Sequence, residues 1–286
     1  GSEMIRQQSF TNAKPTLYLV PTPIGNLEEM TPRAIEILRS VDVIAAEDTR
    51  NTMKLLQVFD IHTRMIAHHA HNERESAKGL LNLLEQGQSV AVVSDAGYPL
   101  ISDPGQNIVE QVTAAGYHVV PVSGCSASLN ALVASGLKAQ PFLFKGFLSS
   151  NDRECVKELE GLKALPFTMI FYEAPHRIER MLGHCLDVFG DRKACLAREI
   201  TKRHEEFLRG TLSELKAAAH GLKGEMVVVI EGCAEVSEPV VDMEMITEQI
   251  NERIQSGLSA SEAIKQIAKE CGMSKNEIYR AYHQES

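Results

Sequence analysis

The sequence predicts an α/β fold built from two domains, in which short buried strands alternate with longer amphipathic helices. The chain has 286 residues, more than one domain usually holds. Residues 90–93 are an unbroken apolar run with no polar alternation, which is typical of a parallel strand covered on both faces. Apolar residues at helical spacing lie between such runs. The pattern therefore favours βα units around a mostly parallel sheet.

The first half of the chain predicts one domain over residues 16–137. Thr31 and Pro32 provide an N-cap and a first-turn proline for the first helix. The expected strands cover residues 16–20, 43–46, 64–67, 89–93 and 118–122. The expected helices cover residues 31–40, 73–86, 105–115 and 127–135.

The second half predicts another α/β domain over residues 138–235. Gly, Lys, Gln and Pro gather at 136–141, as in a linker. The expected strands cover residues 142–147, 168–172, 194–198 and 225–230, with an additional strand at 205–209. The expected helices cover residues 152–162, 176–188 and 212–219.

Both ends of the chain differ from this pattern. Residues 1–15 are polar, and we expect a disordered leader that begins with a cloning scar, Gly1-Ser2. Residues 240–286 are helical in pattern, with helix-turn-helix-like spacing and credible N-caps at Ser259 and Ser274. This tail fits a packing hairpin as well as a nucleic-acid reader.

The composition narrows the class of protein. A formal net charge of −9 opposes nonspecific binding to polyanions, so an RNA partner would need a local basic patch. The six cysteines form no C-x-x-C pair, which argues against a zinc site and a disulfide framework. Because no apolar run is long enough for a membrane span and no secretory signal is visible, we expect a cytoplasmic protein without membrane attachment.

Two loops that follow predicted strands suggest a ligand site. In the loop at 94–105, Gly97 permits close backbone approach while Pro99 stiffens the path. The loop at 21–27 contains Pro23 and Gly25, but it is neither G-x-G-x-x-G nor a P-loop. Ligands of open α/β sheets bind at this carboxyl edge. The alternative for the loop at 94–105 is an ordinary strand-to-helix turn.

A dense polar set follows the second strand. Glu47 or Asp48 could deprotonate a hydroxyl, and Arg50 could hold a phosphate. The alternative is a helix N-terminus capped by Asp48 or Thr49. The histidines at 68–71 lack the further ligands of a metal site, so we expect a polar loop and no metal.

Two mixed-charge loops follow strands of the second half, at 171–177 and 197–206. Arg177, Arg198, Lys202 and Arg203 could meet RNA phosphates if the loops line a cleft. The alternative is a solvated surface of salt bridges.

The order of these motifs resembles the tetrapyrrole methylase superfamily. The motifs are LYLVPTPIGNL, AAEDTR, HAHN, VSDAGYPLISDPG, VVPVSG, FYEAPHR, AREITKRHEE and KGEMVVVIEG, and they span residues 16–232. The resemblance implies two α/β domains with a ligand cleft between them, a small C-terminal helical module and a homodimer. Within the superfamily, the chain is similar to enzymes that use S-adenosylmethionine to methylate the ribose 2′-hydroxyl of a cytidine in the decoding region of small-subunit (16S) ribosomal RNA.

The resemblance also implies which residues contact the methyl donor. They are Pro23, Ile24, Gly25, Asp95, Gly97, Tyr98, Ile101, Ser126, Ala127, Tyr172, Glu173 and Ile200.

For the reaction we expect direct displacement at the methyl group, with Glu47 or Asp48 as base and with Arg50 and Arg198 orienting phosphate or the developing oxyanion.

Two other functions compete with this one. The first is methylation of carbon in a tetrapyrrole, against which the polar set at 47–50 and the first loop argue. The second is a nonenzymatic nucleic-acid-binding regulator that uses the C-terminal helices. Truncation near Pro239 would abolish DNA binding by such a regulator and leave donor binding by a methylase intact.

Overall fold

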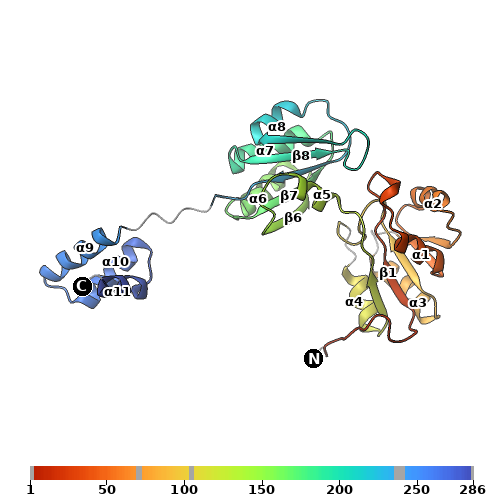
Figure 1. Cartoon of the computed structure of the whole chain (residues 1–286), viewed down its shortest axis with the longest axis horizontal. Coiled ribbons are helices and arrows are strands. Elements are labelled where there is room, and N and C mark those ends of the chain that lie inside the picture. The colour runs from red at the N-terminus through yellow and green to blue at the C-terminus, as the bar shows by residue number, and fades with distance from the viewer. Residues whose placement is uncertain (1–2, 69–72, 103–105, 235–241, 285–286) are drawn as a thin grey trace. The chain divides into compact units, whose positions relative to one another are not determined.

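A computed structural model describes residues 3–68, 73–102, 106–234 and 242–284. The chain forms two compact units, Gly1–Cys233 and Ala234–Ser286 (Figure 1). The first unit contains two sheets of five strands, and the described part of the second unit is helical. The predicted α/β class is confirmed.

The first sheet is parallel throughout, as its buried β-branched runs predict. Its strand order is β3-β2-β4-β1-β5. All four residues of β2 and of β4 are buried, because helices cover both faces of the sheet. The five predicted strands are confirmed to within one residue: β1 (Thr16–Leu19), β2 (Val43–Ala46), β3 (Arg64–Ala67), β4 (Val90–Val93) and β5 (His118–Pro121).

Four helices of the described chain cover this sheet, two on each face. Leu38 of α1 and Leu56 of α2 pack into one apolar cluster, whereas Leu80 of α3 and Val112 of α4 pack into the cluster on the other face. As predicted, Thr31 caps α1, accepting from the Ala34 amide at 3.1 Å. The helices are α1 (Pro32–Ser40), α2 (Thr49–Val58), α3 (Glu73–Glu85) and α4 (Gln106–Ala114), and a 3₁₀ turn, η1 (Leu27–Glu29), precedes α1.

The chain leaves neighbouring strands β1 and β4 toward opposite faces of the sheet. β1 leads to α1 on one face, while β4 leads to α4 on the other. The point between β1 and β4 is therefore a topological switch point, and open α/β sheets bind ligands in the crevice at the carboxyl edge of such a point.

The second sheet is mixed, so the prediction of a mostly parallel arrangement is wrong for this half. Its order is β6-β7-β10-β8-β9, and only β6 and β7 pair in parallel. Antiparallel pairing arises because β9 follows β8 through a short turn and because β10 inserts between β7 and β8. The strands are β6 (Phe142–Phe147), β7 (Thr168–Glu173), β8 (Lys193–Arg198), β9 (Glu206–Thr211) and β10 (Met226–Ile230).

The two faces of the second sheet are covered differently. Helices α6 (Asp152–Leu162), α7 (Ile178–Phe189) and α8 (Leu212–Ala218) enclose the larger core on one face. Helix α5 (Ala127–Ala134) packs on the other face, with Ala131 and Leu132 buried against Ile170 and Val229. The sequence places this helix before the linker, in the first domain, but its contacts are with the second sheet.

The N-terminal segment is attached to the first sheet, so the prediction of a disordered leader is wrong for residues 7–14. The side-chain amide of Gln7 donates to the Val119 carbonyl at 2.8 Å and accepts from the Val119 amide at 2.9 Å. Lys14 donates to the Gly116 carbonyl at 3.1 Å. These side chains hold the segment on edge strand β5 by hydrogen-bonding backbone groups that would otherwise bond to water.

The second unit is a small bundle of α9 (Met243–Gln255), α10 (Ala260–Cys271) and α11 (Lys275–Gln284). Ile250, Ile267 and Ile278 are fully buried at its centre. Ser259 caps α10 as predicted, and Gly272 ends it with the left-handed conformation, φ 68°. The predicted tail helices are confirmed.

Candidate active site

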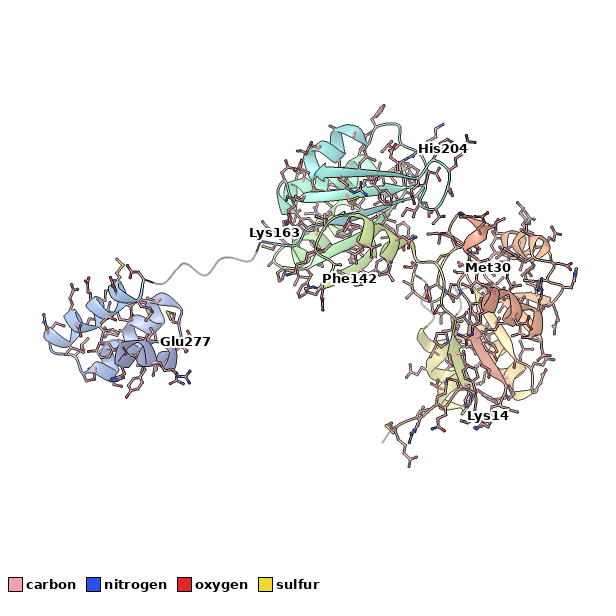
Figure 2. All side chains as sticks on the ribbon, in the orientation of Figure 1. Lys14, Met30, Phe142, Lys163, His204 and Glu277 are labelled. Atoms are coloured by element: carbon pink, nitrogen blue, oxygen red, sulfur yellow. The ribbon has the colours of Figure 1, made fainter. Side chains whose placement is uncertain are left out.

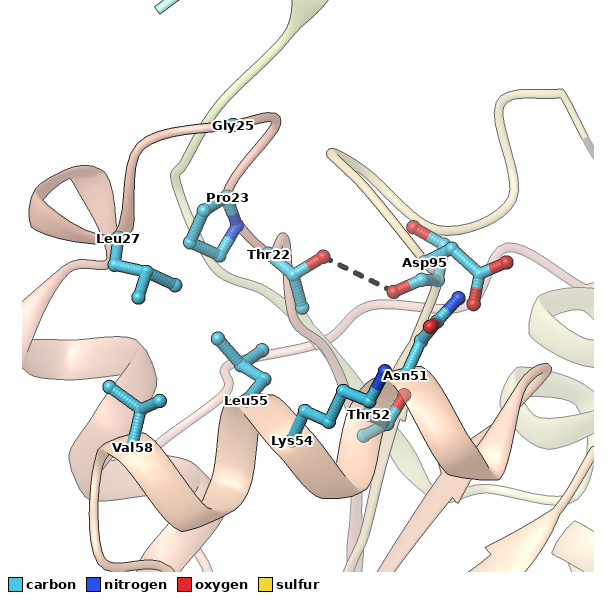
Figure 3. A pocket seen from close by; sticks show the side chains of 11 residues that line it. Thr22, Pro23, Gly25, Leu27, Asn51, Thr52, Lys54, Leu55, Val58 and Asp95 are labelled. Carbon is cyan, nitrogen blue, oxygen red and sulfur yellow. Dashed lines mark hydrogen bonds between the residues drawn. The ribbon is translucent and has the colours of Figure 1, made fainter. Parts of the chain in front are cut away.

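A pocket of about 280 Å³ opens at the crevice between β1 and β4. The loops after these strands form two of its walls and α2 forms the third (Figure 3). Its position matches the ligand site predicted at the carboxyl edge. The lining residues are Thr22, Pro23, Gly25, Leu27, Asn51, Thr52, Lys54, Leu55, Val58, Ser94 and Asp95.

Backbone hydrogen bonds lock the two loops together. The Thr22 amide donates to the Gly97 carbonyl at 3.1 Å, and the Gly97 amide donates to the Thr22 carbonyl at 2.9 Å. The Thr22 hydroxyl also donates to the Ser94 carbonyl at 3.2 Å, drawn as a dashed line in Figure 3. The loops therefore form one rigid frame rather than two independent turns.

The loop after β1 has a second side, which faces residues of the second sheet. Ile24, Ala127 and Tyr172 all pack against the apolar cluster that contains Ile200. A Cβ on Gly25, whose φ is +157°, would lie 2.7 Å from Cγ of Lys202. Four of the segments expected to contact the donor thus meet at this side of the loop.

The tyrosines of the site are held by neighbouring loops. The Gly124 amide donates to the Tyr98 hydroxyl at 3.1 Å, which joins the loop after β4 to the loop after β5. Tyr172 hydrogen-bonds Ser128, and burial raises the pKa of its phenol. Ser126 caps α5 by accepting from the Leu129 amide at 3.3 Å. These contacts bring the third loop beside the first two.

The turn after β8 is strained. Glu199 and Thr201 adopt positive φ values of 51° and 71°, which side chains other than glycine rarely adopt. Within the described ranges, the buried Nε of Arg198 and Oγ1 of Thr201 have no hydrogen-bond partner. Strain and unsatisfied polar atoms gather at functional sites, and Thr201, which has both, places its Oγ1 3.0 Å from where a Cβ on Gly25 would lie.

The polar set after β2 starts helix α2, as one of the two interpretations of the sequence has it. Asp48 Oδ1 accepts from the amides of Arg50 at 3.0 Å and Asn51 at 3.3 Å, and its Oδ2 accepts from the Asn51 side chain at 3.2 Å. Asp48 is therefore the N-cap. Glu47 is partly buried at the carboxyl edge, next to the paired residues Ala46 and Val93, and the Arg50 side chain is exposed.

Glu173 does not share a face with Tyr172. The side chains of a strand alternate, and that of Glu173 lies on the same face as Phe171, toward the core under α6 and α7. Its carboxylate accepts from the Ala174 amide at 2.9 Å, and burial raises its pKa. Only the backbone of Glu173 can therefore contact a ligand on the face of the strand that carries Tyr172.

The expected RNA contacts are only partly brought together. Lys202 and Arg203 lie in the exposed turn that His204 marks in Figure 2, and Lys202 forms an ion pair with Glu199 at 3.0 Å. Arg177 is exposed at the start of α7. None of the described contacts of Arg177 is with the turn that contains Lys202 and Arg203.

Other expected positions add less to the site. Ile101 is exposed in the loop after β4. Residues 69–71 of the histidine motif and residues 103–105 of this loop lie outside the described residues. Among the residues that the structure describes, no group of three or more potential ligands could hold a metal ion.

Sequence reasoning missed the contribution of α2 to the pocket. Asn51, Thr52 and Lys54 line it, whereas the sequence analysis assigns ligand contacts in this segment only to Glu47, Asp48 and Arg50. The signal was present in the cap at Asp48, followed by apolar residues at helical spacing over Leu55, Leu56 and Phe59.

Comparison with known proteins places the chain in a family. The sequence profile of the tetrapyrrole (corrin/porphyrin) methylases matches residues 16–216. The ribosomal RNA small subunit methyltransferase I of Bacillus subtilis is 47% identical and covers 98% of this chain and 99% of its own length. The protein of that name from Halalkalibacterium halodurans is 45% identical and covers 99% of this chain and 100% of its own length.

Solved structures agree on the fold. Diphthine synthase superposes with a TM-score of 0.59 at 15% identity, covering 76% of this chain and 90% of its own. The uroporphyrin-III C-methyltransferase of Thermus thermophilus, solved with S-adenosylhomocysteine, superposes with a TM-score of 0.54 at 18% identity, covering 76% and 97%. Profile, relatives and fold agree: the chain belongs to the tetrapyrrole methylase family and, within it, to the ribosomal RNA small subunit methyltransferase I group of S-adenosylmethionine-dependent methyltransferases.

Proposed function

We propose that the protein transfers the methyl group of S-adenosylmethionine to the ribose 2′-hydroxyl of a cytidine in the decoding region of 16S ribosomal RNA. The observation that carries the proposal is the convergence at the loop after β1. One side of this loop lines a pocket, and its other side meets Ile200 and Thr201. Such a site can hold a donor and an acceptor next to each other.

The residues around Gly25 fit the donor. The buried Thr201 hydroxyl and Arg198 Nε offer polar atoms that a ligand can satisfy, while Ile24 and Ile200 offer an apolar surface. We assign donor contacts to the twelve positions expected from the sequence, with Glu173 acting through its backbone. Asp95 and Pro23 lie at the border between this side and the pocket.

S-adenosylmethionine, when bound, supplies a methyl group on a positively charged sulfur that an oxygen nucleophile can attack. The frame of Thr22 and Gly97 fixes both loops, so positioning contributes a large share of the rate. We assign proton acceptance to a carboxylate oxygen of Glu47. Glu47 is partly buried at the carboxyl edge, directly after Ala46, and Asp48, the cap of α2, is the second candidate.

The cations of the site serve the RNA backbone. We assign phosphate contacts to Arg50, Arg177, Arg198, Lys202 and Arg203. Local cations are required because the net charge of −9 repels nucleic acid at long range. Glu199 pairs with the Lys202 ammonium, and RNA phosphate would compete with Glu199 for it.

The test is transfer of labelled methyl to small ribosomal subunits that lack the modification, with naked 16S RNA and a tetrapyrrole as parallel acceptors. A 2′-O-methylcytidine product from subunits or RNA supports the proposal. Label on a base, or only on the tetrapyrrole, overturns it.

We further propose that the protein acts as a homodimer in the cytoplasm, where small subunits are found. No described helix is both long and apolar enough to cross a membrane. Exposed apolar residues support a dimer: Val133 and Leu129 of α5 are 77% and 46% exposed, and Phe147 of β6 is 52% exposed. Light scattering would give twice the chain mass, and Val133→Glu would shift the mass toward that of one chain.

A further inference from the structure

We propose that the pocket between α2 and the loops after β1 and β4 binds the base of the acceptor nucleotide, turned out of the RNA, and that it selects an amino-bearing pyrimidine. This inference rests on the proposed function. It assigns to Asn51, Lys54, Leu55 and Val58 a role in recognition that the motifs do not indicate.

The location separates the pocket from the donor side. All its lining residues belong to the first-sheet half of the chain. The second-sheet residues expected to touch the donor, among them Ile200 and Tyr172, pack with Ile24 on the other side of the same loop. A ligand in the pocket is thus next to the donor, and the two share only the border residues Pro23, Gly25 and Asp95.

The size of the pocket suits one nucleoside. About 280 Å³ is at the lower limit of small-molecule sites, which span roughly 300–1,000 Å³. A tetrapyrrole macrocycle is much larger than a nucleoside and would not fit. The volume therefore favours the RNA acceptor over the acceptors of the carbon methylases.

The chemistry of the walls suits a flipped base. Figure 3 shows Leu27, Leu55 and Val58 grouped at one end of the pocket. At the other end, the Lys54 ammonium lies with the polar side chains of Asn51 and Asp95. Enzymes that act on a flipped nucleotide hold the base between apolar side chains and contact its edge with polar groups.

The polar end selects for cytosine. A carboxylate accepts from the exocyclic amine of cytosine, as in direct readout of DNA bases, and Lys54 can donate to the carbonyl oxygen of the same ring. Uracil presents a carbonyl oxygen where cytosine has its amine, and Asp95 would repel it.

The experiment fills the pocket from its exposed rim. Val58 is 58% exposed and lines the pocket, whereas Met53 is 44% exposed on the same helix and does not line it. We expect Val58→Trp to raise KM for small subunits by at least about tenfold, given the usual cost of losing base contacts. The dissociation constant of S-adenosylmethionine, measured by calorimetry, should stay unchanged, and Met53→Trp should leave both values unchanged.

A charge-removing pair tests the polar end. Lys54→Met should weaken binding of unmodified subunits and reduce the preference for cytidine over uridine at the target position. Lys78→Met, on α3 at the other face of the sheet, is the matched control. Weakened donor binding in Val58→Trp or Lys54→Met would overturn the proposal and make the pocket part of the donor site. An unchanged KM for small subunits in both variants would also overturn it.

Methyl transfer by the unaltered protein distinguishes failure of this proposal from failure of the proposed function. If it methylates subunits while the pocket variants behave like their controls, the pocket assignment is wrong and the function stands. If it methylates no ribosomal substrate, the function is wrong and the assignment falls with it.

Discussion

At the scale of single residues, Gly25 is a position where the donor side has little room for a side chain. Its positive φ and the Cγ of Lys202, 2.7 Å from the place of a Cβ, oppose any side chain. We expect Gly25→Ala to cost about 1–3 kcal/mol of stability or to move the loop. Calorimetric titration with S-adenosylmethionine should then show at least tenfold weaker binding. Gly79→Ala is the control, because that helical glycine has open space around it.

Glu173 should make stability depend on pH. Burial raises its pKa in the folded state above the ordinary value, so the folded protein binds the proton more tightly than the unfolded chain. The resulting stabilisation is full below pH 4.5 and is lost as pH rises through the raised pKa. Glu173→Gln should therefore gain on the order of 1 kcal/mol over the unaltered protein at pH 8 and less at pH 5. Urea unfolding at both pH values measures this difference, and an equal gain at both would contradict it.

At the scale of elements, helix α2 depends on Asp48. Removing the cap in Asp48→Ala should cost about 1 kcal/mol, and Asp48→Asn should retain the stability, because asparagine caps as well as aspartate. We expect Asp48→Asn to keep methyl transfer within about twofold and Glu47→Gln to lose about a hundredfold. Loss of transfer in Asp48→Asn with unchanged stability would make Asp48 the base.

The elements also show what sequence patterns can and cannot predict. The runs of β2 and β4 are apolar throughout, so their burial in a parallel sheet followed from composition alone. Residues 47–52 fit both a catalytic set and a helix start, because the side chains that cap a helix are also those that bind ligands. The face of Glu173 could not be predicted, because it depends on where β7 ends relative to the helices that cover it.

The donor site shows the same limit on what sequence patterns can predict. Its loops were identifiable from motifs, since each follows a strand and contains glycine or proline at 23–25 and 95–99. Which side of the loop each residue faces, and the strain at Glu199 and Thr201, depend on contacts between segments about 180 residues apart. The pattern of the second sheet was ambiguous because alternating βα spacing does not specify strand direction.

At the scale of the whole molecule, the two compact units should unfold separately. The helical unit has its own core around Ile250, Ile267 and Ile278. A chain ending at residue 238 should keep its affinity for S-adenosylmethionine and the melting temperature of the larger unit. Scanning calorimetry of both chains checks this, with the transition of the helical unit missing from the shorter one. A lowered melting temperature of the remaining unit would show that the units stabilise each other.

The hydrogen-bonded pair of Thr22 and Gly97 joins the pocket wall to the donor side. If either ligand tightens this frame, the other ligand binds to a chain that has already lost part of its freedom to move. Linkage then makes the effect mutual: RNA must strengthen donor binding by the same factor by which the donor strengthens RNA binding. A single short pair of amide contacts would thereby favour the ternary complex over either binary one.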